Sequence, residues 1–175
     1  MSLRMLIVSA VAALFATVAH ADPAAIESAI SAGPASLTKN ATIKNWDGKV
    51  LRKGTNGWTC LPDIPGNGGV DPWCIDQSWA NLLDALSNNK KPTYDKVGIG
   101  YMLAGDAPIS NITPAGKQED GDWVEGLKAH LMILVPDAKM YDNISTDPNN
   151  GGPWIMWPGT PYAHIMVPID SYPNN

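Results

Sequence analysis

The chain has 175 residues, carries 12 Lys and Arg against 17 Asp and Glu, and has a formal net charge of −5 at pH 7. Its basic residues are scattered and form no Lys/Arg cluster, so the sequence predicts neither a nucleic-acid partner nor binding to an anionic membrane surface. The length predicts one domain that is large enough to bury a core.

The first 21 residues have the order of a secretory signal peptide. A short positive region ending at Arg4 precedes an uncharged apolar run over residues 5–18, and Ala19-His20-Ala21 supplies a small-x-small cleavage pattern. This run is shorter than the roughly 20 residues that a membrane-spanning helix needs. We therefore expect cleavage after Ala21, a periplasmic or secreted location, no stable membrane insertion afterwards, and a single secreted domain over residues 22–175.

The first elements after this segment are predicted to be a helix and a hairpin. Asp22 is predicted to be the N-cap and Pro23 the first residue of a short helix, which runs over residues 24–32 and stops at Gly33. Residues 41–46 and 49–53 flank Asp47-Gly48, a dipeptide favoured in a tight type I′ turn.

Residues 54–70 are rich in Gly, Pro and Asn and predict an ordered loop. The loop contains Cys60, and the only other cysteine is Cys74. An even pair in an oxidising compartment favours a disulfide, whereas two thiolates 14 positions apart fit no standard zinc spacing. We expect Cys60 and Cys74 to be bonded, with a pair of metal-binding thiolates as the alternative.

Asp71-Pro72 begins the strongest helical pattern of the chain, which extends to Ser87. Cys74 falls in the predicted first turn, so the disulfide is expected to join the loop to the start of this helix. The apolar residues recur at helical spacing and would form one stripe: Ile75, Trp79, Leu82, Leu83 and Leu86.

The remainder of the chain predicts strands separated by long loops. The loops are expected over 105–122 and 137–152, with a helical turn over 123–129. The strands are expected over 96–104, 130–135, 153–157 and 162–169. Together these elements predict an α+β fold, with a mostly antiparallel sheet, one main helix packed on it and long ordered loops.

One pattern occurs twice and points to chemistry. His130-Leu131-Met132 and His164-Ile165-Met166 both have the form His-x-Met, and both lie in predicted strands. Side chains at positions i and i+2 of a strand point to the same face, so each motif presents an imidazole beside a thioether. Thioether ligands select Cu(I), and imidazole suits copper and zinc. The motifs predict a soft-metal site, with copper as the ion, if the two strands pair near this register.

A purely structural role competes with this hypothesis. Methionine on an apolar strand usually packs in a core, and a neighbouring histidine often only hydrogen-bonds to backbone. The residues between and beyond the motif positions are apolar as well, so both strands are expected to be buried on both faces: Leu131, Ile133, Ile165 and Val167.

Two other functions remain open. Trp154 and Trp157 are flanked by Gly and Pro, and Trp58 lies in the earlier loop, so these rings would provide stacking platforms for a small molecule or a glycan. Alternatively, His130 or His164 would act as the general base of an enzyme. In that case a carboxylate would orient the imidazole, and the candidates are Asp137, Asp147 and Asp170. No nucleophile elbow, zinc-protease motif or phosphate loop accompanies them.

Four blocks of the sequence resemble an uncharacterised family of secreted bacterial proteins. They are GTNGWTC at 54–60, DPWCID at 71–76, HLMILVPD at 130–137, and DPNNGGPWIMWPGTPYAHIMVP at 147–168. The resemblance implies export and a single compact domain, and it implies no activity and no catalytic residue.

Overall fold

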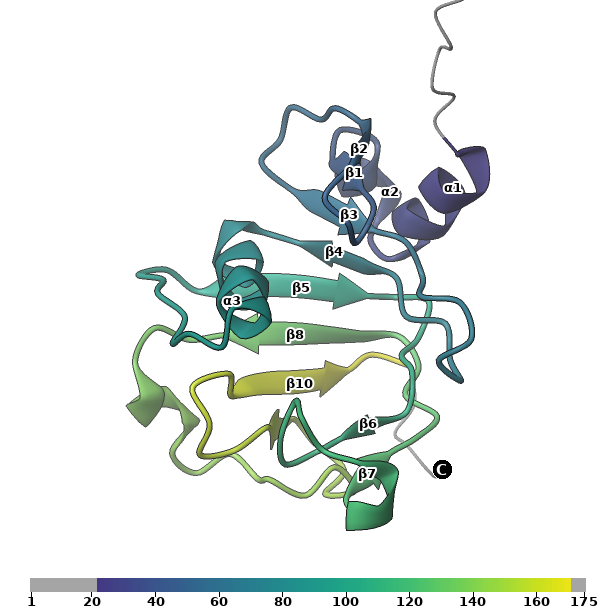
Figure 1. Cartoon of the computed structure of the whole chain (residues 1–175). Coiled ribbons are helices and arrows are strands. Elements are labelled where there is room, and N and C mark those ends of the chain that lie inside the picture. Colours follow the sequence, from purple (N-terminus) through teal and green to yellow (C-terminus); the bar gives the residue numbers. More distant parts are fainter. Residues whose placement is uncertain (1–21, 171–175) are drawn as a thin grey trace, which may run out of the picture.

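A computed structural model of the chain describes residues 22–170 (Figure 1). The predicted signal peptide, residues 1–21, lies outside the described residues. The first elements are α1 (Pro23–Ser31) and α2 (Ala35–Thr38). The Asp22 carboxylate accepts hydrogen bonds from the backbone N–H groups of Ala24 and Ala25, at 3.0 and 3.4 Å. This confirms the predicted first helix and its N-cap.

Eight strands form one sheet in the order β2-β1-β3-β4-β5-β8-β10-β9, and all neighbours are antiparallel except β1 and β3. The strands are β1 (Thr42–Lys44), β2 (Val50–Arg52), β3 (Thr59–Leu61), β4 (Trp73–Ile75), β5 (Gly98–Met102), β8 (His130–Leu134), β9 (Trp154–Met156) and β10 (His164–Pro168). A second, two-stranded sheet pairs β6 (Ile109–Ser110) with β7 (Trp123–Val124). The predicted α+β class is confirmed, as is the hairpin of β1 and β2. Its turn is not of type I′, because Gly48 has a positive φ and Asp47 does not.

The longest helix, α3 (Gln77–Ser87), packs on β4 and β5 (Figure 1). Asp76 caps it, because its carboxylate accepts a hydrogen bond from the Trp79 backbone N–H at 3.1 Å. The buried face of the helix contributes Trp79 and Leu82 to the main core, and β7 contributes Val124. That core therefore lies between one face of the sheet and the elements that cover it.

The opposite face of the sheet is covered only in part. Near α1 a smaller core contains Ala29, Ile43 and the two cysteines, Cys60 and Cys74. Further along, the side chains of β5, β8 and β10 on this face are half-buried, among them Ile99, Leu131, Ile133, Ile165 and Val167. The expectation that both strands of the His-x-Met motifs are buried on both faces is wrong for this face.

Several of the elements predicted from the sequence need correction. Residues 73–75 form β4 instead of the first turn of a helix, so Cys74 lies in a strand. Residues 54–70 contain the short strand β3, and residues 123–129 begin with β7 instead of a helical turn. The loops over 105–122 and 137–152 contain short 3-10 helices, η1 (Gln118–Asp120) and η2 (Ala138–Tyr141).

The two cysteines are bonded as predicted. Cys60 on β3 lies directly opposite Cys74 on β4, and a disulfide joins them. The bond links two neighbouring strands, and not a loop and a helix as expected. Among residues 22–170, no helix has both the length and the apolar character needed to cross a bilayer.

Candidate functional site

The two His-x-Met motifs lie on adjacent strands and face the same side of the sheet. Strands β8 and β10 are antiparallel, and Met132 lies directly opposite Met166. His130 lies opposite Pro168, so the register places His164 beyond the other side of the methionine pair. The four side chains form a row in which the sulfurs are central and the imidazoles are terminal. The histidines are four residue steps apart along the strands, about 13 Å.

Both imidazoles are held in the same way. His130 Nδ1–H donates to the backbone carbonyl of Lys128 at 2.7 Å, and His164 Nδ1–H donates to that of Tyr162 at 3.0 Å. Because a carbonyl only accepts, the proton of each neutral ring lies on Nδ1, and Nε2 carries the lone pair. Burial lowers the pKa of both histidines to about 4, so both rings are neutral at pH 7.

The row is enclosed by the main core. His130, Met132, His164 and Met166 are each at most 2% exposed. The ring of His164 lies between the indoles of Trp79 and Trp157, with ring centroids 5.0 and 4.9 Å away.

Two further methionines extend the row. Met102 is opposite His130 and Met156 is opposite His164, so four thioethers and two imidazoles share this face. Within residues 22–170 there is no group of three or more His, Cys, Asp and Glu side chains arranged to hold a metal ion.

The three tryptophans proposed as a stacking surface do not share one. Trp154 lies in β9 and is fully buried, and Trp157 is 3% exposed. Their indole N–H groups donate to Asn111 Oδ1 at 3.1 Å and to the Ser110 carbonyl at 2.9 Å. Trp58 belongs to the smaller core, where it packs on Tyr101. The expectation of an open loop is wrong for Trp154, because it lies in β9, which pairs with β10, and is buried there. Trp157 does follow the strand in a loop, but its backbone is left-handed, with φ 55°, and its ring is buried as well.

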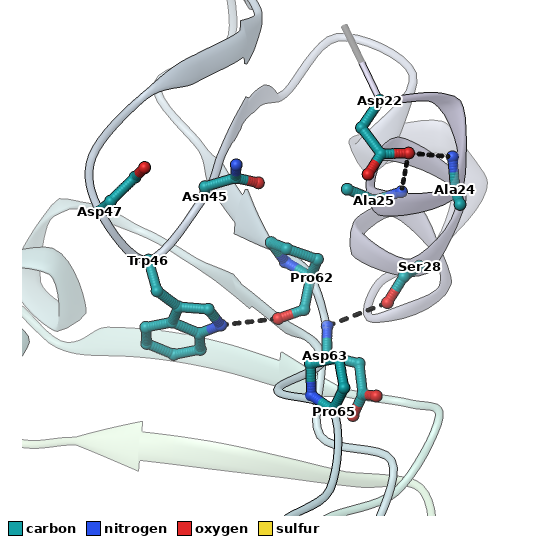
Figure 2. A pocket seen from close by; sticks show the side chains of 10 residues that line it. All are labelled: Asp22, Ala24, Ala25, Ser28, Asn45, Trp46, Asp47, Pro62, Asp63 and Pro65. Carbon is teal, nitrogen blue, oxygen red and sulfur yellow. Dashed lines mark hydrogen bonds between the residues drawn. The ribbon is translucent and has the colours of Figure 1, made fainter.

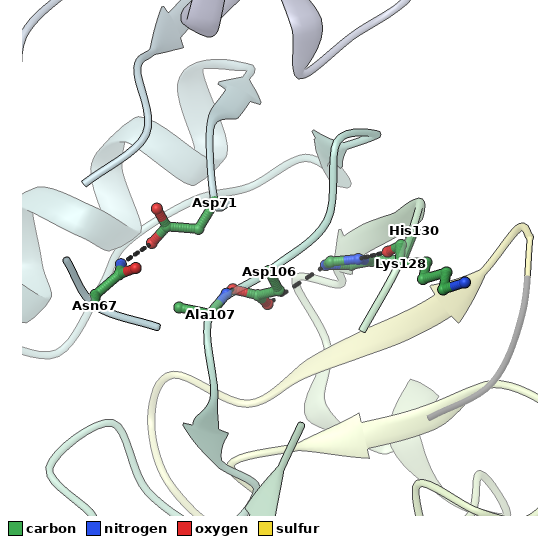
Figure 3. A network of polar contacts seen from close by, with 6 residues as sticks. All are labelled: Asn67, Asp71, Asp106, Ala107, Lys128 and His130. Carbon is green, nitrogen blue, oxygen red and sulfur yellow. Dashed lines mark hydrogen bonds and ion pairs between the residues drawn. The ribbon is translucent and has the colours of Figure 1, made fainter. Parts of the chain in front are cut away.

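A cavity of about 580 Å³ opens at one end of the sheet. Asp71 precedes β4 and Asp106 follows β5, and antiparallel pairing brings these two points together at the same end. His130, the first residue of β8, pairs with Met102 at that end as well. Figure 3 shows the three side chains in sequence, with Asp106 between Asp71 and the imidazole.

Asp106 and His130 form a buried pair. The Oδ2 atom of Asp106 is 3.7 Å from His130 Nε2, and the side chains are 8% and 0% exposed. His130 Nε2 has no hydrogen-bond partner. Burial raises the pKa of Asp106 to about 8, with a further contribution from the charge of Asp71. At neutral pH the pair is therefore uncharged, with the proton on the carboxyl group.

This carboxyl partner was not among the predicted ones. Sequence reasoning named Asp137, Asp147 and Asp170 as carboxylates for the histidines, whereas Asp106 is the acidic residue beside His130. Its only signal in the sequence is its place directly after a strand that pairs with the His130 strand.

A second cavity, of about 530 Å³, lies between α1 and the hairpin of β1 and β2 (Figure 2). Three aspartates line it, but each carboxylate already accepts a backbone hydrogen bond: Asp22 from Ala24, Asp47 from Lys49, and Asp63 from Asp71. In addition, no side chain that lines it carries a buried polar atom without a hydrogen-bond partner, so nothing in this cavity points to a ligand.

Comparison with protein-family models, with curated proteins and with solved structures found no match to the chain.

Proposed function

We propose that this protein binds a soft metal ion, copper(I), at the row formed by His130, Met132, Met166 and His164. The register carries the proposal, because Met132 lies directly opposite Met166 and each is two residues from a histidine on the same face. Two thioethers beside neutral imidazoles form a donor set that favours Cu(I) over harder ions.

The state of the histidines supports this function. A metal-binding histidine commonly donates its second ring N–H to a carbonyl or carboxylate, which fixes the ring and leaves the other nitrogen for the ion. The carbonyls of Lys128 and Tyr162 are placed to do this for His130 and His164. Since both rings are neutral at pH 7, the ion would displace no proton from them.

The spacing favours a site of two sulfurs and one imidazole. The backbone positions of the two histidines are about 13 Å apart along the strands, whereas each histidine is two residues from the methionine pair, which favours one imidazole for the ion. Cu(I) carries a single charge, which keeps the cost of burial lower than for a divalent ion. The predicted signal peptide and the Cys60–Cys74 disulfide support an exported protein that performs this function in an oxidising compartment.

A competition titration with Cu(I) and the chromophoric chelator bicinchoninate tests the proposal. We expect the purified, metal-free protein to take up one equivalent of Cu(I). The variant Met132→Leu/Met166→Leu should lose at least 100-fold in affinity, because exchange of Met for Leu removes the sulfurs while nearly conserving the core volume. Met140→Leu is the matched control, since Met140 is 54% exposed, lies in η2 and belongs to neither strand of the row.

Single variants identify the imidazole. His130→Ala and His164→Ala should have unequal effects, and the one that weakens binding marks the ligand, whereas His130→Ala/His164→Ala should abolish stoichiometric binding. The proposal is wrong if the wild-type protein takes up no Cu(I), or if the double methionine variant binds it as tightly as the wild type.

A further inference from the structure

The cavity at the end of the sheet has the size and lining of a small-molecule site. Its volume of about 580 Å³ falls in the range of 300–1,000 Å³ that is typical of such sites. Three separate segments build it, namely the loop before β4, the loop after β5, and the region from η1 to β7. Its polar and aromatic lining consists of Asn67, Asp71, Trp73, Asp106, Gln118 and Trp123.

The acceptors of the cavity are fixed before any ligand arrives. The Asp71 carboxylate accepts hydrogen bonds from the Ile64 backbone N–H at 3.0 Å and from Asn67 Nδ2 at 2.8 Å. The carboxyl group of Asp106 accepts one from the Ala107 backbone N–H at 2.8 Å. Such anchoring lowers the entropy that a ligand must overcome when it orders these groups.

Two buried polar atoms at this cavity lack partners. The indole Nε1–H of Trp123 is buried and donates to no acceptor. His130 Nε2, which lies 3.7 Å from Asp106 Oδ2, accepts no hydrogen bond. An unpartnered buried polar group costs about 1–3 kcal/mol, so native proteins keep few of them. Trp123 lines the cavity, so a small rotation of its ring would bring the buried indole N–H to a ligand acceptor there.

The composition of the lining selects the class of ligand. Neither Lys nor Arg lines the cavity, so an anion would meet two carboxyl groups and no countercharge. The lining combines donors from Asn67, Gln118 and Trp123 with acceptors from the carboxyl groups, and a hydroxyl group is the ligand group that both donates and accepts. A quaternary ammonium would use the carboxyl groups and the indoles but none of the donors.

We propose that this cavity binds an uncharged, hydroxyl-bearing ring of monosaccharide size, held by Asp71, Asp106 and the Trp123 indole N–H. Trp73 offers an apolar surface to the ring, and its own position is fixed by edge contacts with Trp46 and Trp79 at 6.1 and 5.8 Å. This site does not depend on the proposed metal site, since it uses neither of the methionine sulfurs.

The indole N–H signals of a ¹H–¹⁵N correlation spectrum provide the test. Four indoles already donate to protein acceptors: Trp46 to Pro62, Trp79 to Met132, Trp154 to Asn111 and Trp157 to Ser110. Titration with glucose, galactose, mannose, xylose and N-acetylglucosamine should move the Trp123 signal in a saturable way for at least one sugar. The four engaged indoles should keep their positions and also report that each variant remains folded. Trp123→Phe assigns the signal.

Variants separate the site from a general effect of added sugar. Asp106→Ala and Gln118→Ala should each weaken the affinity about tenfold, the cost of one hydrogen bond in a dry site. Asp47→Ala, in the other cavity, should leave the affinity unchanged. The proposal fails if none of the five sugars moves the signal, if choline or glucuronate moves it instead, or if Asp106→Ala binds the sugar as the wild type does.

Discussion

His130 lies where the two proposed sites meet. Its Nδ1–H is committed to the Lys128 carbonyl, Met102 lies opposite it on β5, and its Nε2 is directed toward Asp106 at 3.7 Å. The same ring therefore borders both the sulfur row and the wall of the cavity. Among residues 22–170, its Nε2 has no hydrogen-bond partner, so this nitrogen is the one that either site would use.

At the residue scale, Gly69 shapes the cavity. A Cβ atom at this position would lie 2.4 Å from both the Ala107 Cα and the Asp106 carbonyl oxygen, which are backbone atoms without room to yield. We expect Gly69→Ala to push the loop of Asp71 away from the loop of Asp106. Overpacking of this kind costs about 1–3 kcal/mol, which urea denaturation should measure.

The matched control for this substitution is Gly152→Ala, where the only close atom is a side-chain oxygen of Asn150 at 3.1 Å. Its unfolding free energy should stay within about 0.5 kcal/mol of the wild type. Gly69→Ala should also lower the affinity of the cavity for any sugar that it binds. Equal stability of Gly69→Ala and the wild type would show that the two loops do not pack as described.

The role of Asp106 could not be predicted from the sequence. An aspartate between Gly and Ala in a long polar loop is typical of a solvated residue. What distinguishes it is burial beside a histidine 24 positions later, and that contact depends on the pairing of β5 with β8. The pairing of Met132 with Met166 was stated as a condition, because strand register depends on non-local contacts that one sequence does not specify.

At the scale of elements, Asp76 ties α3 to the sheet. One carboxylate oxygen caps the helix at the Trp79 N–H, and the other accepts the Ile99 backbone N–H of β5 at 2.7 Å. A cap alone contributes about 1 kcal/mol, and removal of the second bond leaves a strand N–H without its partner. We expect Asp76→Ala to lower the unfolding free energy by about 2–3 kcal/mol in urea denaturation.

Asp22→Ala provides the comparison, since Asp22 caps α1 with no second link to the sheet. Asp22→Ala should lower the unfolding free energy by only about 1 kcal/mol. A cost for Asp76→Ala no larger than that for Asp22→Ala would mean that the bond to Ile99 adds nothing to stability.

The main helix was predicted to begin too early, at Asp71 instead of after Asp76. Asp71-Pro72 has the features of a helix start, and the apolar stripe of Trp79 and Leu82 was correctly assigned to the core. The chain instead extends as β4 until Asp76, because pairing with β3 and β5 and the bond to Cys60 outweigh the local signal. β3 was missed for the same reason, since three residues in a Gly-rich segment show no periodicity of their own.

At the scale of the whole molecule, buried titratable groups make the stability depend on pH in two opposite ways. His130 and His164 have pKa values lowered from 6.5 to about 4, so the unfolded chain takes up protons first as the pH falls below 6.5. The folded state therefore loses stability as the pH falls below 6.5. Asp106 has a pKa raised from 3.8 to about 8, so its folded form keeps a proton that the unfolded chain releases. Stability is lost as the pH rises toward 8.

The sum of these effects predicts a maximum in stability near pH 6.5 for the metal-free protein. Between pH 4 and 6.5, two histidines oppose Asp106 and also Asp71, whose pKa burial raises. Stability should therefore rise with pH by at most about 1.4 kcal/mol per unit. Between pH 6.5 and 8 the histidines no longer oppose Asp106, and its titration should lower stability by about 1.4 kcal/mol per unit. Urea denaturation at half-unit steps from pH 4 to 8 measures both slopes. Asp106→Asn should abolish the fall above pH 6.5 and leave the histidine-dependent loss below it. A wild-type profile that stays level or rises from pH 6.5 to 8 would show that Asp106 is ionised in the folded protein.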